Sequence, residues 1–147
     1  MAAGGKNQFS TPEDAAAAFY AAFERGDVDA MMETWADDDE IFCIHPGGPR
    51  NLGTAAVRNA WVEIFQGHAR LKFQLEQPLL LVGAALAVQS VLEYLQINDD
   101  PALRGPAIAT NIYTRTARGW RIMAHHAAVT PGAAPAAPIA ARSAKLH

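Results

Sequence analysis

The part of the sequence that most constrains the fold is residues 11–38, TPEDAAAAFYAAFERGDVDAMMETWADD. Thr11 suits a helix N-cap, Pro12 suits the first helical position, and the acidic residues that follow complement the positive end of a helix. Apolar residues then recur at helical spacing until Gly26, and Asp27 can cap a second, shorter helix. The stretch therefore predicts two consecutive helices, each with one apolar face.

The chain downstream changes from helical to strand-like patterning. A short strand is expected at residues 41–45, before the Pro-Gly-Gly-Pro of residues 46–49, and a third helix from about Thr54 to Gln66. From Leu71 the apolar period becomes two, as in half-buried strands. Four long strands are expected at residues 71–82, 86–97, 107–116 and 120–129. Helices followed by consecutive strands indicate an α+β domain, with three helices packed on one face of an antiparallel sheet.

Composition bounds the class of protein. The chain has 147 residues, 50% hydrophobic and 18% charged, with a formal net charge of −3, which suits one domain with a hydrophobic core. No basic stripe supports nucleic-acid binding, and no apolar run resembles a signal peptide or a membrane span. The single cysteine excludes an internal disulfide. We expect a cytoplasmic protein without nucleic-acid or membrane partners, comprising a flexible N-terminus (1–10), one domain (11–130) and an Ala/Pro-rich disordered tail (131–147).

Several local strings resemble the NTF2-like superfamily. Residues 11–38 resemble its first two helices, including the Gly-Asp between them. HPGG at 45–48, ATN at 109–111 and GWR at 119–121, with the histidine pair at 125–126, resemble its SnoaL-like, ketosteroid-isomerase-like group. The resemblance implies a cone-shaped half-barrel, in which a curved sheet wraps around the long first helix and encloses an apolar cavity.

The resemblance also implies a homodimer, formed through the outer face of the sheet. The strand pattern supports this independently, because the face away from the helices is not fully polar. The superfamily includes isomerases, polyketide cyclases, dehydratases, transport adaptors and oligomerising domains of kinases, so the fold does not assign a function.

The catalytic groups of the ketosteroid isomerases are largely absent. The resemblance places Phe19 where those enzymes carry a donor tyrosine, and Tyr20 is turned about 100° around the helix. It places His45 at the position of the carboxylate base, and the neutral Thr110 and Asn111 near that of the second acid. Steroid isomerisation by the known mechanism is therefore not expected.

Histidines are the first candidates for acid/base chemistry, because imidazole titrates near physiological pH. His45 ends a strand at the expected cavity mouth; the alternative is that it only hydrogen-bonds the following turn. His125 and His126 are adjacent on a strand and point to opposite faces. Since Trp120 and Ile122 look core-like, alternation favours His126 on the cavity side. The alternative is a buried histidine with a structural hydrogen bond.

Glu93 is the third candidate, because it lies in an otherwise apolar strand. Pointing inward, it would need a partner such as Asn111 or a histidine, and a Glu93–His126 pair would form an acid/base dyad. Pointing outward, it would face solvent opposite Arg115.

Two further readings of these side chains have less support. No motif spacing supports a metal site built from His45, His126 and Glu93, so no metal and no cofactor is expected. Cys43 shares a strand face with His45, but side chains two apart on a strand are separated by roughly 7 Å, which favours core packing over a nucleophilic pair.

The sequence therefore predicts His45, His126 and Glu93 as catalytic candidates. The expected cavity lining is Tyr20, Trp61, Phe65, Tyr94 and Asn111. Two function classes stay open. One is a cofactor-independent isomerase, cyclase or dehydratase that acts on a small hydrophobic carbonyl compound, and the other is a non-catalytic ligand-binding or dimerisation module.

Overall fold

The computed structural model describes residues 8–67 and 69–130, so the predicted tail at 131–147 lies outside the described residues. The helices are α1 (Pro12–Arg25), α2 (Val28–Glu33) and α3 (Thr54–Phe65). The first begins as predicted, because the Thr11 hydroxyl accepts a hydrogen bond from the Asp14 backbone N–H at 3.0 Å. It ends at Gly26, whose φ of 65° is the left-handed conformation that glycine adopts without strain. Asp27 caps α2 through the Ala30 N–H.

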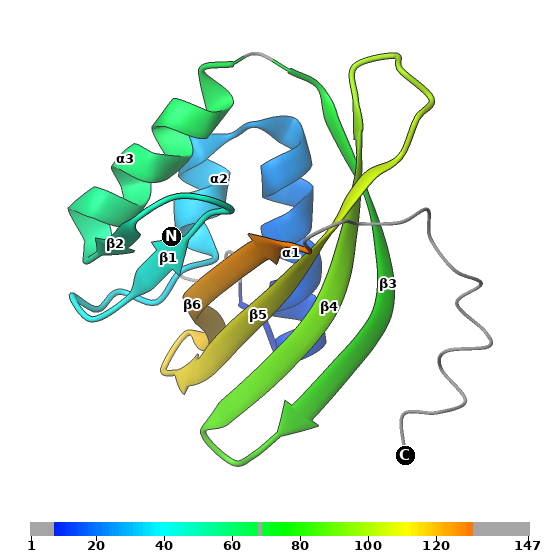
Figure 1. The fold of residues 1–147 in the computed structure, drawn as a ribbon. Helices are drawn as coiled ribbons and strands as arrows, with labels where there is room; N and C mark the ends of the chain where they lie inside the picture. The colour runs from blue at the N-terminus through cyan, green and yellow to red at the C-terminus, as the bar shows by residue number, and fades with distance from the viewer. Residues whose placement is uncertain (1–7, 68, 131–147) are drawn as a thin grey trace.

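The strands form one six-stranded sheet in the order β2-β1-β6-β5-β4-β3 (Figure 1). They are β1 (Phe42–Ile44), β2 (Arg50–Leu52), β3 (Leu71–Val82), β4 (Leu86–Ile97), β5 (Arg104–Thr116) and β6 (Gly119–Val129). The four long strands make the predicted antiparallel meander, whereas β1 pairs with β6 in parallel, so the sheet is mixed. The α+β fold class is confirmed. The sequence did not predict the short strand β2.

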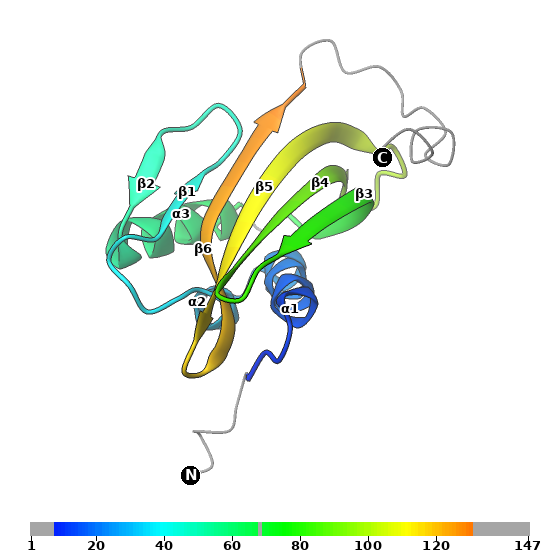
Figure 2. The ribbon, with the colours of Figure 1, turned by 90° about the horizontal axis from the view of Figure 1, so that it is seen from below.

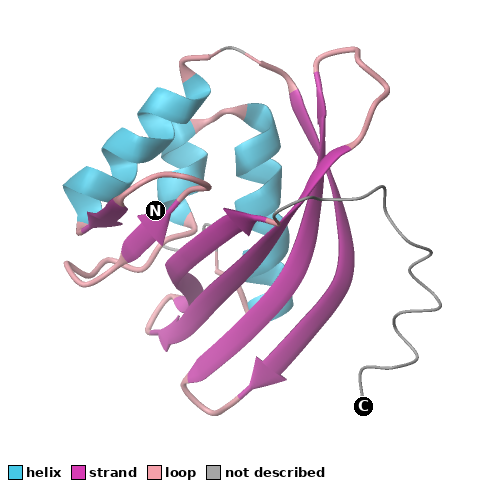
Figure 3. Cartoon of the chain, viewed as in Figure 1, coloured by secondary structure: helices cyan, strands magenta, loops and turns pink. Residues whose placement is uncertain are grey.

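All three helices lie on one side of the sheet, and the long strands curve over α1 (Figures 2 and 3). Phe19 of α1 is fully buried between helices and sheet, where its ring makes edge contacts with Trp35 and Trp61. These aromatic contacts join α1 to the segment that follows α2 and to α3. Among the described residues, no helix has both the length and the apolar character needed to cross a membrane.

Of the three register shifts in the strand pairing, the two that involve β5 lie next to residues of the cavity wall. Between β5 and β6, Ile112 pairs with Ala124 but Tyr113 pairs with Ile122, so Met123 has no partner opposite it. A second shift lies in the β4–β5 pairing, after Glu93. Each such bulge reverses the inward and outward alternation of the bulged strand.

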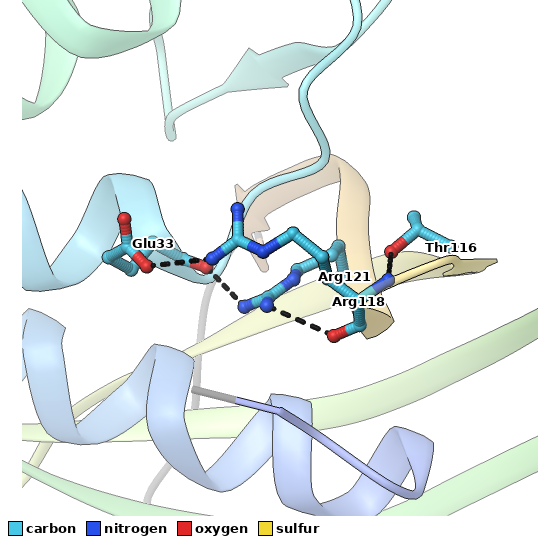
Figure 4. A network of polar contacts seen from close by, with 4 residues as sticks. All are labelled: Glu33, Thr116, Arg118 and Arg121. Atoms are coloured by element: carbon cyan, nitrogen blue, oxygen red, sulfur yellow. Dashed lines mark hydrogen bonds and ion pairs between the residues drawn. The ribbon is translucent and has the colours of Figure 1, made fainter. Parts of the chain in front are cut away.

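Close to the bulge at Met123, Arg121 of β6 is buried and joins the sheet to the end of α2 (Figure 4). Its guanidinium donates to the Glu33 carbonyl at the end of α2, at 2.6 Å, and to the Arg118 carbonyl at 3.1 Å. The same guanidinium lies over the ring of Phe9, 4.6 Å from its centroid. Phe9, which the sequence placed in a flexible stretch, also pairs with Gly119.

Candidate functional site

A cavity of about 370 Å³ lies between the inner face of the sheet and helices α1 and α3. This volume falls within the range of small-molecule sites. Its walls are mainly apolar, and its titratable groups are Glu93, His45, His125 and Arg104. The apolar lining comprises Phe23, Pro46, Ile64, Phe73, Leu95, Gly105, Ala107, Ala127 and Val129.

Glu93 points into this cavity and is 7% exposed. It follows the inward positions Ala87, Gln89 and Val91 of β4, which are also buried. The Tyr20 hydroxyl donates a hydrogen bond to its carboxylate at 2.6 Å. Burial raises the pKa of Glu93 to about 7, although the hydrogen bond from Tyr20 acts in the opposite direction. Of the two orientations left open by the sequence, the structure has the inward one.

A buried hydrogen-bond network continues from Tyr20 to His125. The Asn111 amide donates to the Tyr20 oxygen and to Gln89 Oε1, both at 3.0 Å, and Tyr113 also donates to Gln89. Asn111 Oδ1 lies 2.6 Å from His125 Nδ1. The network connects Glu93 and His125 through side chains from α1 and β5.

His125, not His126, faces the cavity, so the sequence-based assignment of His126 was wrong. His125 is 1% exposed and lines the cavity, whereas His126 is exposed on the other face. The bulge at Met123 explains the error, because it shifts the inward positions from Trp120 and Ile122 to His125. The expected Glu93–His126 dyad therefore does not form. Burial lowers the pKa of His125 to about 3.

His45 lines the cavity as expected, with its ring 5.7 Å from that of His125 and 4.7 Å from that of Trp61, between centroids. Burial lowers the pKa of His45 to about 4. Its Nε2 lies 3.5 Å from Cys43 Sγ, so the expected separation of roughly 7 Å was wrong. That spacing assumed a regular strand, but β1 ends at Ile44, one residue before His45. Burial raises the pKa of the Cys43 thiol to about 11, which disfavours a thiolate nucleophile.

None of the five residues predicted to line the cavity does so. Tyr20 and Asn111 stand behind Glu93 and His125 in the network just described. Trp61 packs against His45 and Phe65 packs against Trp61. Tyr94 is buried, but alternation along β4 places it on the opposite face from Glu93.

Sequence reasoning missed several wall residues that carry recognisable signals. Phe23 belongs to the apolar stripe of α1, and Phe73 is at an inward position of β3. Arg104, at the cavity wall, lies outside the strand predicted at residues 107–116, whereas β5 begins at this residue; its guanidinium pairs with Asp100 at 3.3 Å. Glycine and proline argue against a strand interior, although strands tolerate both at bulges.

A second hollow of about 300 Å³ shares His45 and Ile64 with the main cavity. Its other walls are Gly48, Pro49, Asn51, Ala60 and Glu63. His45 thus stands where the two spaces adjoin. Among residues 8–67 and 69–130, no three His, Cys, Asp or Glu side chains are grouped as a metal ion would require.

Known structures share this fold. A protein from Thiobacillus denitrificans, described as a proposed calcium/calmodulin-dependent protein kinase type II association domain, is 40% identical, with a TM-score of 0.80 over 85% of this chain and 99% of that chain. A proposed dehydratase of the NTF2-like family from Streptomyces avermitilis is 28% identical, with a TM-score of 0.71 over 79% of this chain and 91% of that one.

Another relative is similar to this chain over a smaller part of its own length. The F-box protein SKIP8 of Arabidopsis thaliana is 25% identical over 100 residues, which are 68% of this chain and 41% of that protein. The family model for the SnoaL-like domain matches residues 13–131, which include all of the strands and helices given above except Pro12, the first residue of α1. The protein therefore belongs to the SnoaL-like domain family, within the NTF2-like fold.

Proposed function

We propose that the cavity binds a small, largely apolar carbonyl compound and that Glu93 moves protons on it, without a cofactor, as an isomerase, cyclase or dehydratase would. The observation that carries this proposal is a buried carboxyl group in an apolar cavity, hydrogen-bonded by Tyr20 and accompanied by His45 and His125. Polar groups placed this way in an otherwise apolar pocket are typical of ligand sites.

Glu93 is the side chain best suited to transfer the proton. Because its pKa is about 7, it is divided between acid and conjugate base near neutral pH, as general acid/base catalysis requires. His45 and His125 have pKa values of about 4 and about 3 and stay neutral at that pH. They would act as hydrogen-bonding partners of the ligand.

The proposed step is proton abstraction next to the carbonyl group. Ionised Glu93 takes the proton, the C–H bond breaks, and its electron pair moves onto the carbonyl oxygen to give an enolate. A neutral His45 has one ring N–H with which to stabilise that oxygen. If a carbon–carbon double bond lies β,γ to the carbonyl, the enolate is conjugated with it, and return of the proton from Glu93 to the γ-carbon completes an isomerisation. In a β-hydroxy compound, the hydroxyl instead leaves with that proton as water.

Deuterium incorporation from D₂O tests this proposal without knowledge of the natural substrate. The probes are 1-tetralone, 2-tetralone and 2-decalone, and exchange of the protons next to the carbonyl is followed by proton NMR. Wild type should exchange at least one of them faster than buffer, and Glu93→Gln should lose on the order of 10²-fold or more of that acceleration. His126→Gln, on the outer, exposed face of β6, is the control that should keep the acceleration.

The same three ketones also distinguish catalysis from binding alone. If a ketone shifts NMR signals of cavity residues but exchanges no faster than in buffer, the chain is a ligand-binding module. If Glu93→Gln exchanges as fast as wild type, Glu93 is not the proton carrier.

A second candidate function is self-association through the outer face of the sheet. Outward side chains of β3, β4 and β5 form an exposed apolar surface, here called the outer patch: Leu79, Leu81, Leu86, Val88 and Ile108. Within this patch, Leu81 pairs directly with Val88 across neighbouring strands. The Thiobacillus denitrificans relative is described as an association domain, which agrees with a homodimer here. The two functions are compatible, since the cavity lies on the other face.

A further inference from the structure

Asn111 of β5 is fully buried and lies at the centre of the network behind the cavity. Its amide group has two hydrogens to donate and one oxygen that accepts. Both hydrogens are used, toward Tyr20 and Gln89, and the oxygen faces His125 Nδ1 at 2.6 Å. The side chain thus contacts both the partner of Glu93 and the ring of His125.

The direction of each hydrogen bond follows from proton counting. An ionised carboxylate can only accept, so the single hydroxyl proton of Tyr20 must point to Glu93. The Tyr20 oxygen must then accept from Asn111, which requires the amide nitrogen on that side. The Asn111 oxygen is left facing His125, and an oxygen at 2.6 Å requires a hydrogen on Nδ1.

We propose that Asn111 is a positioning residue that holds His125 as the tautomer with its hydrogen on Nδ1, which leaves a bare Nε2 to accept a hydrogen bond from a ligand hydroxyl in the cavity. The part that concerns the ligand rests on the proposed function. Among the described residues, Asn111 is the hydrogen-bond partner of the His125 ring, and Asn111 does not line the cavity. The ring nitrogen left for the cavity is therefore Nε2.

This tautomer implies a preference among ligands. Because Nε2 of His125 can only accept a hydrogen bond in this tautomer, it favours a ligand atom that carries hydrogen. A ligand hydroxyl can therefore bind at His125, whereas a ligand carboxylate cannot. The substrate class narrows to hydroxy-carbonyl compounds, with the carbonyl next to Glu93 and the hydroxyl at His125.

A reversed network is the competing arrangement. If Glu93 is protonated it can donate to Tyr20, Tyr20 can donate to Asn111, and a flipped Asn111 amide can donate to His125 Nδ1. The hydrogen of His125 would then sit on Nε2. The two arrangements place the hydrogen of His125 on different ring nitrogens, which NMR distinguishes directly. The titratable groups around the network are Tyr20 on α1, His45 beyond β1, Glu93 on β4, Tyr113 on β5 and His126 on β6.

The test is long-range proton–nitrogen correlation NMR of the ¹⁵N-labelled, ligand-free chain at pH 8.5, where Glu93 is mainly ionised. We expect His125 to show a protonated Nδ1 and an unprotonated Nε2, the form less common in water. A hydrogen on Nε2 of His125 overturns the proposal. The exposed His126 in the same spectrum is the internal reference.

Two variants separate positioning from mere packing. Asn111→Asp keeps an oxygen toward His125 and should keep the hydrogen on Nδ1. Asn111→Leu removes that acceptor and should lose the Nδ1–H signal in favour of Nε2–H. Persistence of Nδ1–H in Asn111→Leu contradicts the role of Asn111. If Asn111→Leu does not fold, the wild-type and Asn111→Asp spectra decide.

The outcome is independent of catalysis. A hydrogen on Nδ1 together with no ketone exchange would refute the proposed function and leave the tautomer assignment standing. A hydrogen on Nε2 together with Glu93-dependent ketone exchange would refute the tautomer assignment and leave the proposed function standing.

Discussion

The Tyr20 hydroxyl donates a 2.6 Å hydrogen bond to the Glu93 carboxylate, which joins α1 to the middle of the sheet across 73 residues of sequence. The neighbouring Phe19 occupies the aromatic core instead. Adjacent residues of a helix are rotated by about 100°, so Phe19 packs in the core whereas the Tyr20 hydroxyl points toward Glu93. Tyr20 thereby reaches the buried acid of the cavity.

Removal of this hydroxyl should weaken the fold measurably. Tyr20→Phe leaves one Asn111 hydrogen without an acceptor in a buried site, at a cost of about 1–3 kcal/mol in the free energy of unfolding. Urea denaturation measures this cost. Tyr94→Phe is the matched control, since Tyr94 is buried on the other face of β4. Equal losses in both variants would show that the network adds no stability.

Glu93 should make stability depend on pH in the neutral range. Its pKa is about 7 in the folded state against an ordinary value of 4.5, so the folded chain holds the proton more tightly. Its contribution is fully present below pH 4.5 and is lost as pH rises through 7, by at most about 3 kcal/mol.

Glu93→Gln tests this, because glutamine is neutral and can still accept from Tyr20. The variant should gain stability relative to wild type as pH rises from 5 to 8.5, measured by urea denaturation at each pH. A difference between the two proteins that does not change with pH would contradict the raised pKa.

The two buried histidines should have the opposite effect at acidic pH. Their folded pKa values of about 4 and about 3 lie below the ordinary 6.5, so the unfolded chain takes up protons first. Their contribution is present above pH 6.5 and is lost as pH falls from there toward 4 and 3. His45→Gln and His125→Gln should each flatten the loss of stability between pH 7 and pH 4.5. His126→Gln serves as the exposed control; a flattening as large as in the buried variants would refute this account.

Gly105 should resist substitution because its backbone lies against β4. Its φ is 110°, and a Cβ atom there would lie 2.8 Å from the Glu93 carbonyl oxygen. Gly105→Ala should lower the free energy of unfolding by more than about 1 kcal/mol, because the strained backbone and the steric clash both destabilise the folded state. Gly47→Ala has a similar positive φ of 75° with nothing within 4 Å, so it isolates the backbone part. Thermal denaturation measures both variants. Equal decreases in Tm in Gly105→Ala and Gly47→Ala would contradict the prediction, because they would show that the steric clash is relieved.

The outer patch should mediate dimerisation. Leu81→Lys places a charge within the patch and should convert a dimer to a monomer in size-exclusion chromatography with light scattering. Leu52→Lys is the control, because Leu52 is equally apolar and exposed but lies on β2. A wild-type monomer at micromolar concentrations would contradict self-association through this face.

The sequence predicted most of the fold because local signals and global packing agree. The cap at Thr11, the glycine at residue 26 and the period-two strands each correspond to an element of the structure. The short β2 was missed because three residues, Arg50–Leu52, carry no detectable periodicity.

The site was less predictable, because its residues depend on strand register. One unpaired residue, Met123, reverses the alternation of β6 and exchanges the roles of His125 and His126. Nothing in the sequence around Met123 marks that bulge. The partner of Glu93 was equally hidden, since Tyr20 comes from a distant helix.

The most direct test of the proposed site is the titration of the Glu93 carboxyl in the ligand-free protein, followed by ¹³C NMR from pH 3 to pH 9. The structure predicts a midpoint of about 7, since the group is buried in an apolar cavity with Tyr20 as its hydrogen-bond donor. A midpoint near the ordinary 4.5 would show that water reaches the carboxyl freely, and would contradict a buried acid poised for proton transfer.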